Sequence, residues 1–172
     1  TGLLILPEFE RKTLDMLKVN QVSMSKLYFG KLLCSFLMVL PVQLLLFLIF
    51  IIVTKIYGIT LDLSLQTHLK WLFLSVLASF PIITLQSYVI VKTRNFSKSV
   101  GLATIGSMLN FVLIFINEDL TKFFPYSQPM IALRSRSLTE MSFNDLIIFL
   151  VVNSLYSLFL YKLTVRALEK EK

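Results

Sequence analysis

The chain has few charged residues, one cysteine and one histidine, and each shortage excludes a class of protein. Charged residues make up 16% of the 172 residues, against about 25% in soluble domains, while 56% are hydrophobic. Cys34 alone allows neither a disulfide framework nor a thiolate metal site. His68 is alone as well, so no HExxH zinc site exists, and its place beside Lys70 and Trp71 favours an interfacial side chain over a catalytic base.

The sequence also lacks the motifs of energy-coupled catalysis. No GxxxxGK[ST] loop is present, because Gly30-Lys31 is followed by Leu32 and lacks the earlier glycine. No acidic or basic residue interrupts the long apolar runs, so the acidic relay of a proton- or sodium-coupled transporter is missing. We therefore expect no enzyme and no cofactor bound by this chain, and any transport must draw its energy from another subunit.

Long runs without a charged residue dominate what remains. A helix rises about 1.5 Å per residue, so roughly 20 apolar residues cross the hydrocarbon layer. The last run is shorter, but it continues beyond Lys162, whose ammonium can reach the headgroups. The sequence predicts an all-α membrane protein whose region 32–172 contains four spans, at about 32–54, 71–91, 99–117 and 146–165.

The net charge of +7 is distributed unevenly around these spans. Twelve of the seventeen cations lie in three segments, namely 1–31, 92–98 and 162–172. Since basic residues accumulate on the cytoplasmic side of membrane proteins, both ends of the chain and the 92–98 loop are expected there. The excess indicates topology in a multi-pass plasma-membrane protein and a lipid bilayer as partner, rather than a nucleic-acid surface.

The N-terminal region differs from the spans. Residues 1–6 form an apolar stub that is expected to stop at Pro7, and residues 7–31 read as a cytoplasmic amphipathic segment. The pattern breaks at 20–23, which predicts two short helices joined by a bend, with Ser23 or Ser25 capping the second. An anchor that lies on the lipid surface and touches no partner is an open alternative.

A few residues inside the spans are not needed for contact with lipid. Pro41 and Pro81 can kink their helices, which predicts a packed bundle that satisfies the freed backbone groups. The amides Gln43, Gln86 and Asn110 are candidates for interhelical hydrogen bonds or for a pathway lining.

Small residues and an aromatic external segment add two further expectations. Ala103 and Ser107, with Gly101 and Gly106 nearby, predict close approach of another helix to the third span. Segment 118–145 combines aromatic residues and prolines with few charges. It is therefore either a short helix that dips into the outer leaflet, broken by its prolines, or a loop that caps the bundle.

Four stretches together resemble the permeases of ABC-2 type transporters. They are Glu8–Leu14 (EFERKTL), Leu17–Ser23 (LKVNQVS), Tyr28–Leu33 (YFGKLL) and Phe124–Pro129 (FPYSQP). In that family an acidic amphipathic stretch follows the second span and precedes the third. Gln21 stands where the family usually has proline, which affects the bend and leaves the rest of the match intact.

The resemblance implies a place for each segment. Residues 1–6 would be the tail of a preceding span, so the chain would be the C-terminal part of a longer permease, and the 8–22 stretch would be a coupling helix. Two such permeases, identical or different, would form a pathway, and a separate cytoplasmic ATPase subunit would bind ATP and dock on the coupling helix. The residues expected in that docking surface are Glu8, Glu10, Arg11, Thr13, Leu14 and Leu17.

Two functions from different classes follow from the sequence. The first is a transporter permease subunit that exports a peptide, drug or other amphipathic substrate, of the kind that gives bacteriocin immunity or drug efflux. The second is a self-contained four-helix membrane scaffold or assembly protein with a lipid-binding N-terminus. An enzyme acting on lipid would need clustered catalytic residues, and the sequence shows none.

Overall fold

The computed structural model describes residues 2–10, 13–58, 64–134 and 141–170, and every regular element in these ranges is helical. The elements are α1 (Gly2–Glu10), α2 (Thr13–Val19), α3 (Met24–Ile56), α4 (Leu65–Thr93), α5 (Phe96–Ile116), α6 (Glu118–Thr121), the 3-10 turn η1 (Pro125–Ser127), α7 (Gln128–Ala132) and α8 (Phe143–Lys170).

Four of the described helices, α3, α4, α5 and α8, are long and apolar enough to cross a membrane, which confirms the all-α membrane fold with four spans. All four begin before the predicted apolar runs, α3 at Met24, α4 at Leu65, α5 at Phe96 and α8 at Phe143. A charged residue ends an apolar run without ending a helix, and so Lys26 and Lys31 lie within α3.

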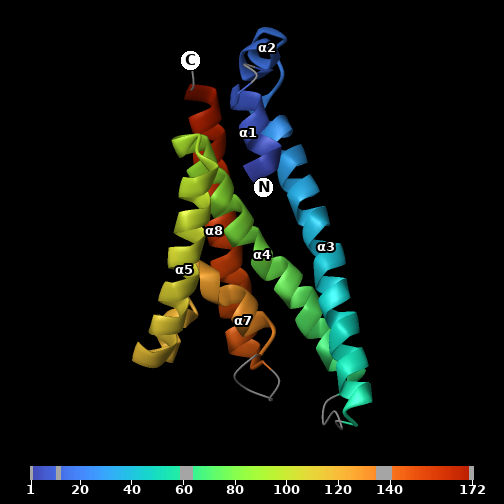
Figure 1. Ribbon diagram of the computed structural model, residues 1–172. Helices are drawn as coiled ribbons and strands as arrows, with labels where there is room; N and C mark the ends of the chain where they lie inside the picture. The colour runs from blue at the N-terminus through green and yellow to red at the C-terminus, as the bar shows by residue number, and fades with distance from the viewer. Residues whose placement is uncertain (1, 11–12, 59–63, 135–140, 171–172) are drawn as a thin grey trace.

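The segments richest in basic residues lie at one end of the bundle. Figure 1 shows α2, the turn between α4 and α5, and the C-terminal end of α8 at one end of the molecule, with α6 and α7 at the other. The segments with the most basic residues are therefore adjacent in space as well as similar in composition. This end is called the basic end below.

Helix α4 is the centre of the bundle. It packs most extensively against α8 and also contacts α1, α3, α5 and α7. Small and hydroxyl-bearing residues, including Ser75, Ala78, Thr84 and Ser87, are buried along it and allow the neighbouring backbones to approach.

Helix α3 leaves most of its surface uncovered by the rest of the chain. Half of the most apolar stretch of α4 is buried, whereas none of the corresponding stretch of α3 is. Aromatic rings fasten α3 to α4 at two levels, through Phe36 on Phe80 at 4.2 Å and Phe50 beside His68 at 5.4 Å between centroids. At the start of α4, His68 therefore packs between the rings of Phe50 and Trp71.

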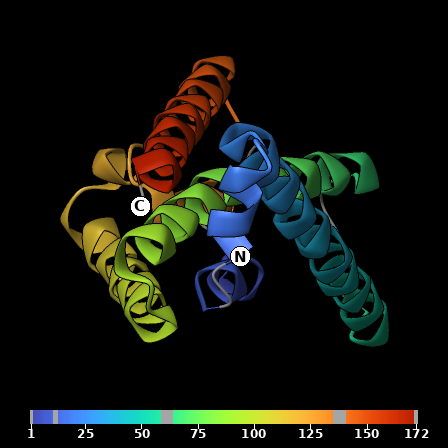
Figure 2. The ribbon, with the colours of Figure 1, turned by 90° about the horizontal axis from the view of Figure 1, so that it is seen from above.

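The N-terminal stub is part of the bundle. Its helix, α1, continues through Pro7 as far as Glu10. Figure 2 shows α1 in the angle between α3 and α4, where Ile5 is only 2% exposed and Lys31 donates to the Leu4 carbonyl. Burial of apolar side chains against two long helices maintains the helix although Pro7 removes a backbone donor.

The predicted bend lies between α2 and α3, but neither serine caps as expected. Gln21 adopts the left-handed conformation with φ of 56° between the two helices. Ser23 occupies the N-cap position of α3 without a side-chain hydrogen bond to the helix. Ser25 pairs instead with Tyr161 on α8, so its hydroxyl joins two helices rather than ending one.

Segment 118–134 packs against the spans. Pro125 and Pro129 lie in the first turns of η1 and α7, where a missing N–H costs little, and so they begin these turns rather than break them. Ser127, Gln128 and Ala132 are buried, and α7 contacts α4 closely. The rest of the predicted external segment, residues 135–140, lies outside the described ranges.

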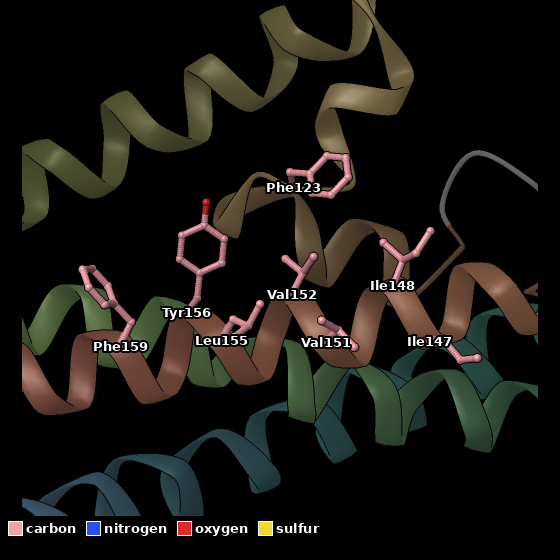
Figure 3. A pocket seen from close by; sticks show the side chains of 8 residues that line it. All are labelled: Phe123, Ile147, Ile148, Val151, Val152, Leu155, Tyr156 and Phe159. Carbon is pink, nitrogen blue, oxygen red and sulfur yellow. The ribbon is translucent and has the colours of Figure 1, made fainter.

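We expect Tyr161→Phe to lower stability by about 0.5–1.5 kcal/mol, because it removes the phenol bonds to Ser25 at 2.8 Å and 3.0 Å while the ring can still stack on Tyr28. Thermal unfolding in detergent, followed by circular dichroism, measures the change. Tyr156→Phe is the control, since Figure 3 shows its hydroxyl pointing away from α8. Equal shifts for the two variants would contradict the assignment.

Candidate functional site: a buried amide cluster beside an apolar groove

A glutamine in the C-terminal third of α4 joins three elements. The Gln86 side-chain amide donates to the Tyr126 hydroxyl at 2.7 Å, and the Ser99 hydroxyl donates to the Gln86 carbonyl oxygen. Burial raises the pKa of the Tyr126 phenol, whose oxygen accepts the amide hydrogen. Gln86 therefore links α4 to both α5 and η1.

Two residues of α5 complete the contact with the same turn. The Ser127 hydroxyl donates to the Asn110 side-chain oxygen, and both residues are buried. Gly106, one turn before Asn110, lies directly against the Tyr126 ring, and a Cβ added there would come within 2.4 Å of it. Only glycine allows this ring to reach Gln86 in the observed position.

Gln128 and Asn153 fix the adjacent helix. The Gln128 side chain is fully buried, and its amide donates to the carbonyls of Lys122 at 2.8 Å and Phe124 at 3.2 Å. Its oxygen accepts a hydrogen bond from Asn153 of α8 at 2.9 Å. The two carbonyls belong to the residues on either side of Phe123. The hydrogen-bonded pair of Gln128 and Asn153 therefore holds Phe123 in place beside α8.

The sequence identified part of this cluster. Gln86, Asn110 and Gly106 come together as candidate packing residues, whereas Gln43 is half-buried on α3 and has no hydrogen bond to them in the described part of the chain. Gln128 and Asn153 were missed. The signal for Asn153 was available, as it is an amide within the last apolar run, but Gln128 lies in a segment that reads as a loop.

The expected docking residues are only partly described. Arg11 lies outside the described residues, as do the side chains of Glu8, Glu10 and Leu14 on α1 and α2. Thr13 begins α2 and is half-buried, and Leu17 packs inward against the core of the basic end.

Two apolar residues of α2 face outward. Met16 is 66% exposed and Val19 is 82% exposed, and they lie one turn apart. Met16 faces outward while the adjacent Leu17 packs inward, because neighbouring residues on a helix point in different directions. We call Met16 and Val19 the α2 tip.

An apolar groove of about 480 Å³ runs along α8 (Figure 3). Seven residues between Ile147 and Phe159 line it, and Phe123 lies across from them. Val151, Leu155 and Phe159 are exposed, so the groove is open along its side. A volume of this size is typical of sites for drug-sized ligands.

Charged residues stand at one end of this groove. Lys122 pairs with Asp119 at 2.9 Å and with Asp145 at 3.4 Å, which ties α6 to the first turn of α8. The hydrogen bond to Asp119, together with attraction by Asp145, raises the pKa of Lys122 and keeps it cationic. The three side chains carry two negative charges and one positive charge.

A second groove, of about 470 Å³, lies between α4 and α5. Gln86 and Ser99 are at its base, and Ala103 and Ser107 border it. The close approach of another helix at Ala103 and Ser107 stays a prediction, while the neighbouring Gly106 lies against the Tyr126 ring.

Comparisons with protein-family models, curated proteins and solved structures find no match to this chain. Within the described residues no group of three His, Cys, Asp or Glu side chains is placed to hold a metal ion.

We expect Gly106→Ala to lower stability by about 1–3 kcal/mol, because the added methyl group must displace the Tyr126 ring and weaken its bond to Gln86. Gly101→Ala is the matched control on α5, since no atom lies within 4 Å of its added Cβ, and it should be neutral or stabilising by up to about 1 kcal/mol. Thermal unfolding in detergent compares the two. A tolerated Gly106→Ala would show that the ring contact is not needed.

Proposed function

We propose that this chain is the membrane permease subunit of an ABC transporter, that it exports an amphipathic substrate, and that a separate ATPase subunit powers it through α2. The observation that carries the proposal is the α2 tip. Two exposed apolar side chains stand on a short helix at the basic end, where the charge distribution predicts cytoplasm. Exposed methionine suits a contact surface because its side chain adapts to a partner.

The attachment of α2 to the spans supports a coupling role. Leu17 of α2 and both Leu6 and Phe9 of α1 pack onto a core formed with α3, α4 and α8. The guanidinium of Arg94, at the end of α4, lies 5.4 Å from the centre of the Phe9 ring. A displacement of α2 would therefore be passed through packed side chains to α4, which all the other spans contact.

The uncovered surfaces of α3 and α5 are compatible with a second permease. Both helices expose long rows of apolar side chains, and only 17% of the most apolar stretch of α5 is buried. Lipid satisfies such a surface as well as a protein does, so this observation permits the pairing without requiring it. The substrate pathway would lie between the two bundles.

The topology can be tested with single cysteines in a Cys34→Ser background. Ser97→Cys, at the α4–α5 turn, should react with a membrane-impermeant maleimide only after the cells are opened. Asn144→Cys, at the start of α8, should react in intact cells. Both native residues are exposed, so burial does not bias the comparison. The reverse labelling pattern would place the α2 tip outside the cell and eliminate docking to an ATPase.

Docking itself can be tested with Met16→Glu combined with Val19→Glu. The two carboxylates should abolish copurification of a P-loop ATPase from native membranes, and with it vanadate-sensitive ATP hydrolysis, because a charge buried at an apolar contact is unfavourable. Lys170→Glu is the matched control. It changes the net charge by the same −2 at the same end of the bundle and should leave both readouts intact.

Other outcomes separate the two candidate functions. If the double variant retains the ATPase and its full activity, the α2 tip is not the docking surface. If no P-loop ATPase accompanies even the unmodified chain, and the double variant instead loses its association with vesicles, the lipid-binding scaffold is favoured.

A further inference from the structure

The groove on α8 has the shape of a site for one extended apolar chain. Its α8 residues recur every three or four positions and so form one face, which from Ile147 to Phe159 extends roughly 18 Å at 1.5 Å per residue. The Tyr156 hydroxyl is the polar group among the lining side chains, and Phe123 covers the groove opposite Val152 and Ile148 (Figure 3).

The charged end of the groove continues this face. Asp145 lies three residues before Ile148, which places it on the same side of α8 one turn further on. Lys122 directly precedes Phe123 and contacts both carboxylates. The Asp119 side chain pairs with Lys122 and is 81% exposed.

The local charge decides which headgroup fits there. With Lys122 already shared between Asp119 and Asp145, one negative charge remains in excess, so a cation is attracted and an anion is repelled. Phe123, which follows Lys122 in the chain, is exposed and offers a ring face for a cation–π contact. A neutral headgroup would gain neither interaction.

We propose that the α8 groove binds a cationic amphiphile with a single apolar chain, the chain lying between Phe123 and α8 and the cationic group lying at Asp119 and Asp145. The inference deepens the proposed function by naming the charge and shape of the substrate, and its meaning for export rests on that function. Binding to the groove, however, can be measured on this chain without an ATPase.

The test uses the full chain in nanodiscs of phosphatidylcholine and a photoreactive dodecyltrimethylammonium probe, with labelled peptides identified by mass spectrometry. Label should concentrate on the peptides that contain 147–159 and Phe123, and unlabelled dodecyltrimethylammonium should compete better than dodecyl maltoside or dodecyl sulfate. Leu155→Trp should weaken binding at least about tenfold, because the indole fills the groove. Leu158→Trp is the matched control, as Leu158 is 61% exposed, like Leu155 at 63%, but does not line the groove.

Two variants test the charged end. Asp145→Asn and Asp119→Asn should each weaken the cation about fivefold or more and leave dodecyl maltoside unchanged. Asp119→Asn also retains the Lys122–Asp145 pair, so a loss of affinity there cannot be attributed to a detached α6.

Three results would overturn the proposal. They are equal effects of Leu155→Trp and Leu158→Trp, unchanged cation binding in both asparagine variants, and a copurified phospholipid that prevents labelling of the groove and that the cation does not displace. Groove binding, combined with the failure of any P-loop ATPase to copurify from native membranes, would instead count against the proposed transporter and leave the binding site standing.

Discussion

Hydrocarbon offers no hydrogen bonds, and the rest of this structure depends on that constraint. Backbone groups are satisfied within helices, and hydroxyls on α4 such as Ser75 and Ser87 donate to carbonyls of the preceding turn. The side-chain amides of Gln86, Asn110 and Gln128 also find partners on other elements. The buried polar atoms decide which helices meet, while the apolar surfaces would tolerate many arrangements.

The amide cluster also shapes the apolar groove. Gln128 fixes the carbonyls on either side of Phe123, and Asn153 ties the same glutamine to α8. The two walls of the groove, Phe123 and α8, are therefore both held by hydrogen bonds of Gln128. A substrate that separated Phe123 from α8 would strain these bonds, so occupancy of the groove and the position of α7 are physically linked.

Helix α8 connects the groove with the basic end. Tyr161 and Leu168 meet α3 and the N-terminal helices there, while Asp145 and Ile148 stand at the charged end of the groove. The central helix α4 packs most extensively against α8, and it contacts α1 towards its C-terminal end and α7 near its middle. In the proposed transporter, these two helices are the elements through which motion of α2 would reach the binding groove.

Helix content, the number of spans and the clustering of basic segments followed from the sequence, because they depend on how each stretch meets water or lipid. Gln86 and Asn110 could be picked out in the same way, as isolated amides in apolar runs. Their partners could not, since pairing depends on the three-dimensional path of a segment that reads as a loop. The same limit applied to Ser25, which fits a cap but bonds to Tyr161 136 residues away, and to the groove, whose walls come from two distant stretches. Local chemistry determined which residues lie in the membrane, and only tertiary packing decided which of them meet.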